Sequence, residues 1–90
     1  MEKARVEKPT GKKLREMKVE TWSSWEHGRD EFDWYYPQTE KFYVREGKAE
    51  VITETGQIVR FSAGDLVTFP RGIKCTWRIT EPIKKVFTFE

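Results

Sequence analysis

Hydrophobic and polar residues alternate along most of the chain in short runs, and Gly, Pro or Asp interrupts each run. Runs rich in Trp, Phe, Tyr, Val and Ile with such breaks are typical of an antiparallel sandwich or barrel. The pattern predicts eight strands from residue 21 onward: Thr21–Glu26, Glu31–Tyr36, Lys41–Arg45, Lys48–Glu54, Gln57–Phe61, Asp65–Phe69, Lys74–Thr80 and Ile83–Phe89. The alternation therefore predicts an all-β protein.

Turn signals separate the strands. Thr55–Gly56 predicts a hairpin turn, and Glu46–Gly47 and Ser62–Gly64 predict similar reversals where the backbone takes a positive φ. These breaks set the expected limits of the strands on either side.

The first twenty residues have a different pattern. Thr10 is a good helix N-cap, and Leu14, Met17 and Lys18 follow at helical spacing, so we expect a short helix from Thr10 through Lys18. Val6 suits an edge strand, and we expect no second helix. Residues 1–20 would then form an N-terminal strand and helix, and residues 21–90 a β-barrel.

Composition limits the function classes. Ninety residues allow a single domain, here 1–90, and the net charge of +2 among 36% charged residues indicates a solvated surface and no polyanion-binding stripe. A lone cysteine excludes an internal disulfide, and no apolar run is long enough for a membrane span or a signal peptide, so we expect a cytoplasmic protein without membrane partners. The absence of Asn and the excess of Lys and Glu favour a thermostable protein.

Two spacing patterns carry a family resemblance. The first pattern runs Gly28, five residues, Trp34, one residue, Tyr36, three residues, Glu40, six residues, Gly47, and the second runs Gly64, five residues, Pro70, one residue, Gly72, two residues, Cys75, three residues, Ile79. Together they resemble the two motifs of the cupin superfamily, G(X)5HXH(X)3-4E(X)6G and G(X)5PXG(X)2H(X)3N. The resemblance implies a small single-domain cupin: an antiparallel β-barrel, or double-stranded β-helix jelly roll, with a short N-terminal helix.

The resemblance also identifies the positions of the usual metal ligands. In the family, three histidines and a glutamate hold one divalent metal, and their positions here are occupied by Trp34, Tyr36, Glu40 and Cys75. Only Glu40 keeps its type, so we expect no cofactor. If a divalent metal does bind, Glu40 and Cys75 would hold it. The segment Val67–Gly72 is similar to the ureidoglycine aminohydrolase cupin domain group, which implies a metal-dependent hydrolase as one alternative, with His27 or Tyr36 as a further ligand.

Strand alternation predicts which side chains share the interior of such a barrel, because residues two apart point to the same face. We predict a ligand pocket with Trp34, Phe42 and Trp77 as walls, Glu40 as polar anchor, and Tyr36 and Cys75 as further polar contacts. Aromatic walls with a few polar groups suit a small polar or aromatic metabolite. Whether the protein converts that ligand or only binds it stays open.

Each of these residues also has a structural interpretation. Glu40 could pair with a Lys or Arg near the mouth of the barrel, Cys75 could pack as a small buried hydrophobe, and the aromatic residues could fill the core. The protein would then be a catalytically silent interaction protein. A nucleic-acid partner is disfavoured: the segment Lys41–Arg45 interleaves basic and aromatic residues, but the charge is nearly neutral and no RNP-like motif is present. A homodimer is compatible with exposed edges at Val6 and Phe87–Phe89.

Overall fold

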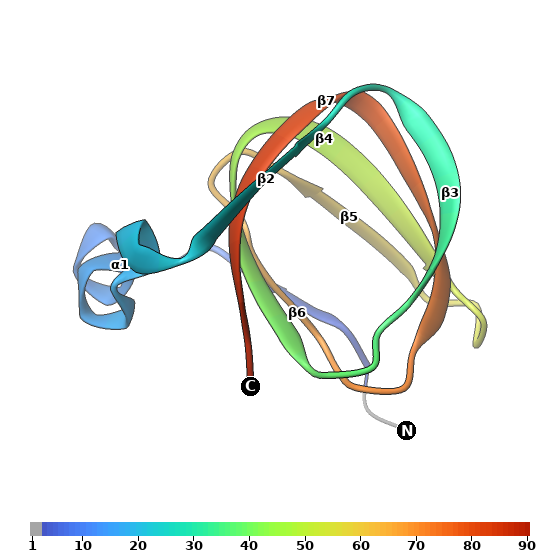
Figure 1. The fold of residues 1–90 in the computed structure, drawn as a ribbon, viewed down its shortest axis with the longest axis horizontal. Coiled ribbons are helices and arrows are strands. Elements are labelled where there is room, and N and C mark those ends of the chain that lie inside the picture. The colour runs from blue at the N-terminus through green and yellow to red at the C-terminus, as the bar shows by residue number, and fades with distance from the viewer. Residues whose placement is uncertain (1–2) are drawn as a thin grey trace.

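The computed structural model describes residues 3–90, and most of these belong to antiparallel strands (Figure 1). The elements in chain order are β1 (Arg5–Glu7), α1 (Gly11–Met17), η1 (Val19–Thr21), β2 (Ser23–His27), β3 (Asp30–Tyr35), β4 (Glu40–Thr53), β5 (Ile58–Ser62), β6 (Leu66–Phe69) and β7 (Lys74–Phe89). The predicted fold class, mostly β with one short helix near the N-terminus, is confirmed.

Two long strands organise the sheet. The first half of β4 pairs with β6 and with the second half of β7, whereas the second half of β4 pairs with β5 and with the first half of β7. The second half of β7 also pairs with β2 and its first half with β3. Because β4 and β7 bend midway, their two halves belong to two facing layers that enclose the core (Figure 1).

The bend in β4 corrects one prediction. We expected Glu46–Gly47 to end one strand and Lys48 to begin another, but β4 runs unbroken from Glu40 to Thr53 through bulges between Val44 and Ala49. Gly47 has a φ of 94°, and a Cβ placed there would lie 2.1 Å from the carbonyl oxygen of Pro82. A glycine is needed because the two long strands cross here with their backbones nearly in contact. The predicted break between Thr80 and Ile83 is likewise absent, since β7 continues through it.

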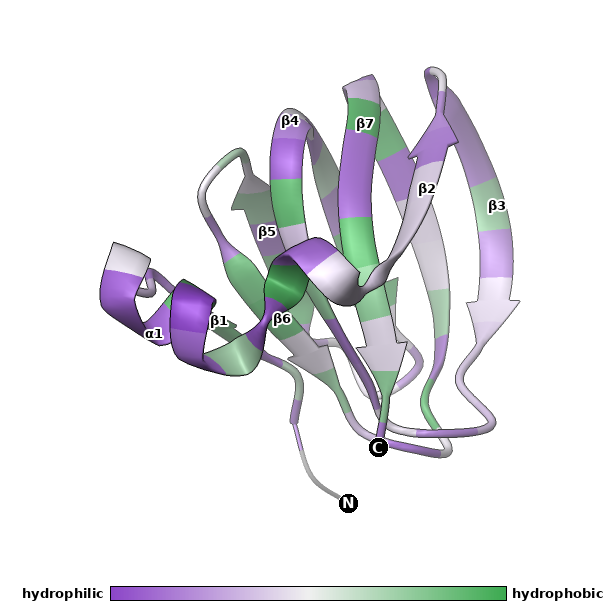
Figure 2. Cartoon of the chain, turned by 60° about the vertical axis from the view of Figure 1, so that its left-hand side comes forward, coloured by the Kyte–Doolittle hydropathy of each residue, from purple (hydrophilic) through white to green (hydrophobic). Residues whose placement is uncertain are grey.

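Alternation along the long strands builds the core. Hydrophilic and hydrophobic residues alternate along β4 and β7 (Figure 2), and inward side chains such as Phe42, Val44, Val51, Trp77 and Ile79 are buried. The other turn predictions hold: Gly56 and Gly64 both have positive φ in the turns before and after β5. The period-2 pattern therefore gave the correct faces even where the strand limits were wrong.

The N-terminal segment follows its local signals. The Thr10 side chain accepts a hydrogen bond from the Lys13 amide at 3.1 Å, which caps α1, and Lys18 ends the helix with a φ of 55°. No residue of α1 is fully buried, and Leu14 and Met17 are half-buried. A 3-10 helix, η1, follows directly and was not predicted.

Two predictions concern the sheet edges. Val6 lies on β1, which pairs only with β6 among the described strands and is an edge as expected. The second expected edge holds in part: Phe87 pairs with both Phe42 and Ser23, whereas Thr88 and Phe89 pair only with β4 among the described strands. Among residues 3–90, no helix is long and apolar enough to cross a membrane.

Candidate functional site

A cavity of about 310 Å³ lies between β2, β3 and the bent strand β7. Seven of its nine lining residues are aromatic, and only Glu40 and Lys85 carry a charge. The lining consists of Trp25, Phe32, Trp34, Tyr36, Glu40, Trp77, Lys85, Phe87 and Phe89. Small organic ligands are commonly bound in cavities of this size with mostly apolar walls and a few polar groups.

The charged pair of the cavity is a buried ion pair. Lys85 Nζ donates to Glu40 Oε2 at 2.8 Å, and both side chains are only 7% exposed. Glu40 opens β4 and Lys85 lies in the second half of β7, where the two strands are neighbours. A Lys or Arg partner was one expected interpretation of Glu40, and the partner is Lys85.

Aromatic rings surround the Lys85 ammonium. Its Nζ lies 4.0 Å from the centre of the Phe42 ring, 5.0 Å from those of Trp25 and Trp77, and 5.5 Å from that of Phe87. Ring faces attract a cation, but the same rings exclude water from it. Burial lowers the pKa of Lys85, and the Glu40 carboxylate opposes this shift. The ammonium therefore depends on Glu40 and on the rings to stay charged.

Tyr36 adds a hydroxyl to the same wall. Trp77 Nε1 donates to the Tyr36 hydroxyl oxygen at 3.1 Å, and the Tyr36 ring stacks on Phe69 at 4.7 Å. Burial raises the pKa of the Tyr36 phenol well above its usual range, and the negative charge of Glu40 adds to this shift. Tyr36 is thus a neutral hydroxyl whose oxygen is already an acceptor and whose own proton is available for donation.

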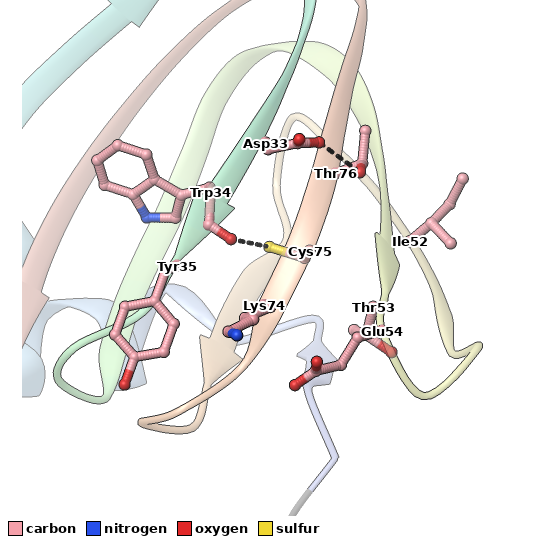
Figure 3. Close-up of a pocket in the computed structure, with 9 residues that line it drawn as sticks. All are labelled: Asp33, Trp34, Tyr35, Ile52, Thr53, Glu54, Lys74, Cys75 and Thr76. Atoms are coloured by element: carbon pink, nitrogen blue, oxygen red, sulfur yellow. Dashed lines mark hydrogen bonds between the residues drawn. The ribbon is translucent and has the colours of Figure 1, made fainter.

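Trp34 and Cys75 are paired across β3 and β7 but face different spaces. The Cys75 thiol donates to the Trp34 carbonyl oxygen at 3.5 Å, whereas the Trp34 ring points away from the thiol (Figure 3). Trp34 is 48% exposed and lines the cavity as well as an outer groove, while Cys75 lines only the groove. Burial raises the pKa of Cys75 to about 11, so the thiol is protonated at neutral pH.

The predicted pocket residues therefore divide into two groups. The structure brings Trp34, Tyr36, Glu40 and Trp77 together around the cavity. Phe42 and Cys75 lie outside its lining, which corrects their placement: Phe42 is fully buried behind the Lys85 ammonium, and the Cys75 thiol faces the Trp34 backbone.

His27 lies at the end of β2, apart from this cavity. Its Nε2 is 2.9 Å from Asp30 Oδ2, and its ring stacks on Trp25 at 5.2 Å. The hydrogen bond to His27 lowers the pKa of the exposed Asp30 carboxyl. His27 thus belongs to an exposed pair beside the β2–β3 turn and does not join Glu40 and Cys75.

The residues at the four usual ligand positions do not form a metal-binding set. Glu40 already binds an ammonium, the Cys75 thiol keeps its proton and points at a carbonyl, and Trp34 offers no ligand atom. Within residues 3–90, no three His, Cys, Asp or Glu side chains lie close enough to hold one ion. The positive charge next to Glu40 comes from Lys85.

Sequence reasoning missed five of the lining residues: Trp25, Phe32, Lys85, Phe87 and Phe89. Phe32 lies two residues before Trp34 on β3, and Lys85 directly follows Lys84 on β7. Alternation distinguishes the two lysines: Lys85 shares a face with Ile83, which is buried, and with Phe87. Lys84 is 54% exposed and pairs with Glu46 at 3.5 Å.

Comparisons with known proteins place the chain in a recognised group. A family model described as the EutQ-like cupin domain matches residues 14–87. A crystal structure of a DUF861 family protein from Thermotoga maritima is 46% identical with a TM-score of 0.96, over 98% of this chain and 100% of that one. The EutQ protein of Clostridium difficile is 26% identical with a TM-score of 0.67, over 73% of this chain and 52% of that one.

A third structure shows the fold alone. It is a DUF861 family protein of unknown function from Pseudomonas syringae, 22% identical with a TM-score of 0.67, over 74% of this chain and 29% of that one. No curated protein matches the chain.

Proposed function

The chain belongs to the EutQ-like cupin family, and from that premise we propose that it binds a small, planar organic molecule in the aromatic cavity. The observation that supports this proposal most is the cavity itself, with seven aromatic side chains around one buried ion pair. Stacking on the rings would hold the plane of the ligand. The finer likeness to ureidoglycine aminohydrolase stays a prediction.

The polar groups of the cavity narrow the ligand class. Glu40 and Lys85 neutralise each other, so a ligand with a strong net charge would have to disrupt a buried pair at high cost. Among the described residues only one oxygen of Glu40 is paired, and the Tyr36 hydroxyl proton is available. An uncharged aromatic compound with one or two hydrogen-bonding groups matches this wall best.

The cavity also bears on the alternative of a silent barrel. A barrel filled by its own side chains would leave no space at this point, whereas about 310 Å³ remains between the rings. Trp34, at the rim and 48% exposed, is not needed to close the core. A half-exposed tryptophan beside a cavity is well suited to cover a bound ring.

The test is a calorimetric titration with uncharged aromatic compounds, beginning with benzyl alcohol and indole, alongside thermal melting. A ligand present at about 100 times its Kd should raise the free energy of unfolding by about 2.7 kcal/mol. Replacing Trp34 with alanine should weaken binding, and Trp22→Ala is the matched control because Trp22 lies outside the cavity lining.

Two results would contradict the proposal. One is failure of every compound in such a panel to bind. The other is binding of equal strength in wild type, Trp34→Ala and Trp22→Ala, since this would place the ligand elsewhere on the protein.

A further inference from the structure

We propose that Lys85 is a nucleophilic amine that captures a small aldehyde or ketone in the cavity as a reversible imine, with Glu40 as its proton acceptor and donor. The inference rests on the proposed function, because the carbonyl compound must first enter the aromatic cavity. It adds a substrate class, uncharged carbonyl compounds, and a covalent step that binding alone does not include.

The position of Lys85 distinguishes it from the nearby exposed lysine. Its side chain lines the cavity and is 7% exposed, whereas Lys84, its neighbour on β7, is 54% exposed and faces Glu26 and Glu46. Lys85 therefore belongs to the wall that a compound bound in the cavity would contact. The amine and a bound carbonyl carbon would meet without a diffusional step.

An amine attacks a carbonyl only when it is neutral, and Lys85 has a proton acceptor within hydrogen-bond distance. Glu40 Oε2 lies 2.8 Å from Nζ and can take one ammonium proton directly. The products of that transfer, an amine and a carboxylic acid, are both uncharged, which suits an aromatic surrounding.

The step balances without an oxidant or a reductant. The Nζ lone pair forms a bond to the carbonyl carbon, and the π electrons of the carbonyl move to its oxygen, which takes the proton held by Glu40. Glu40 then takes a second proton from the nitrogen and passes it to that oxygen, and the C–O bond breaks to release water. Two ammonium protons thus leave with the water, and the third stays on the protonated imine.

The surroundings accommodate the product as well as the ammonium. A protonated imine carries the same single positive charge as the ammonium, so the four rings and the Glu40 carboxylate stabilise both. The Tyr36 hydroxyl lies on the same wall with its proton available, which suits it to bind the carbonyl oxygen. An aromatic aldehyde combines the reactive group with a ring that the cavity walls can stack.

Reductive trapping tests the inference. Wild-type protein at neutral pH is mixed with a small excess of benzaldehyde and treated with sodium borohydride, and the modified lysines are located by peptide mass mapping. We expect one benzyl group per chain, on Lys85. Lys84→Arg should keep this adduct, and Lys85→Arg should lose it.

A second measurement applies even if Lys85→Arg fails to fold. Excess benzyl alcohol, which has the same ring and no carbonyl, should protect Lys85 of the wild type from labelling. Equal labelling of Lys85 and the exposed Lys84 would overturn the inference. If benzyl alcohol binds but Lys85 is never labelled, the covalent step is wrong and the proposed binding function stands; if neither compound binds, both are wrong.

Discussion

Lys85 Nζ and Glu40 Oε2 lie 2.8 Å apart inside a ring of aromatic side chains, forty-five positions apart in the sequence. In the cupin resemblance Glu40 stands where a metal ligand would, and here it holds an ammonium from the chain itself. Opposite charges that are both withdrawn from water depend on each other, because either one alone would be buried without compensation.

Replacing one partner of this pair should therefore lower the free energy of unfolding more than replacing both partners. Glu40→Gln and Lys85→Met should each lower the free energy of unfolding by about 3–5 kcal/mol, because each leaves one buried charge unpaired. The double variant should lie within about 1 kcal/mol of wild type, because no unpaired charge remains. Urea unfolding of the four proteins measures the coupling, and losses that simply add would contradict the account.

Gly47 gives a prediction about the crossing of the two long strands. A methyl group there would meet the backbone of Pro82 at 2.1 Å, and the φ of 94° is unfavourable for alanine. Gly64 has a similar φ of 96° but open space around its Cβ position, so it is a matched control. Gly64→Ala should lower the free energy of unfolding by about 1–2 kcal/mol, because only the unfavourable φ opposes the alanine there.

Gly47→Ala should cost at least about 2 kcal/mol more than Gly64→Ala, because the backbone of Pro82 must also move. Thermal and urea unfolding of both variants measure the difference. Equal losses would show that the two strands are not in close contact at this point.

The interior contains one hydroxyl whose removal should stabilise the folded protein. Thr68 Oγ1 is buried and has no hydrogen-bond partner among the described residues. Thr68→Val keeps the shape and removes the unsatisfied group, so it should raise the free energy of unfolding by about 1 kcal/mol. Thr76 on β7, whose hydroxyl donates to Asp33 at 2.9 Å, is the control, and Thr76→Val should not stabilise. A destabilised Thr68→Val would contradict this interpretation.

Cys75 predicts a pH dependence at alkaline pH. Its pKa is raised from 9.0 to about 11 in the folded protein, so between pH 9 and 11 the unfolded chain loses a thiol proton that the folded chain keeps. The unfolded state then binds fewer protons, and stability falls as pH rises through this range. Wild type should lose about 1–2 kcal/mol more than Cys75→Ala between pH 9 and 11, after allowance for partial solvation of the thiol.

This difference isolates the thiol from the lysines and tyrosines that titrate in the same range. If the free energy of unfolding had the same pH dependence in wild type and Cys75→Ala, the raised pKa of Cys75 would be contradicted. A fast reaction of native Cys75 with a thiol reagent at neutral pH would contradict it too, because the protonated thiol is a poor nucleophile.

Much of the fold could be predicted because its signals are local. The alternation along β4 and β7 identified the inward faces, and the Thr10 cap marked the start of α1. The continuity of the two long strands could not be predicted, because the local sequence around Gly47 is compatible with a bulge and with a turn. Only the crossing with Pro82, a contact between distant segments, distinguishes them.

The candidate site was predictable in part for the same reason. The spacing pattern located Trp34, Tyr36 and Glu40, but it contains no signal for the lysine that pairs with Glu40. Lys85 directly follows another lysine, Lys84, so its type alone does not mark it as a cavity residue. Phe89 reaches the cavity from the last strand. Which inward side chains line a space and which fill it depends on packing between β2, β3 and β7, and no local pattern reports that.

The binding claim is tested most directly by an NMR titration of the four tryptophan indole N–H groups in 15N-labelled protein, with benzyl alcohol and related uncharged aromatic compounds. Trp25, Trp34 and Trp77 line the cavity and Trp22 does not. The account predicts saturable shifts of the first three signals with the Trp22 signal unchanged. Shifts confined to Trp22, or no shift of any indole signal across the panel, would contradict it.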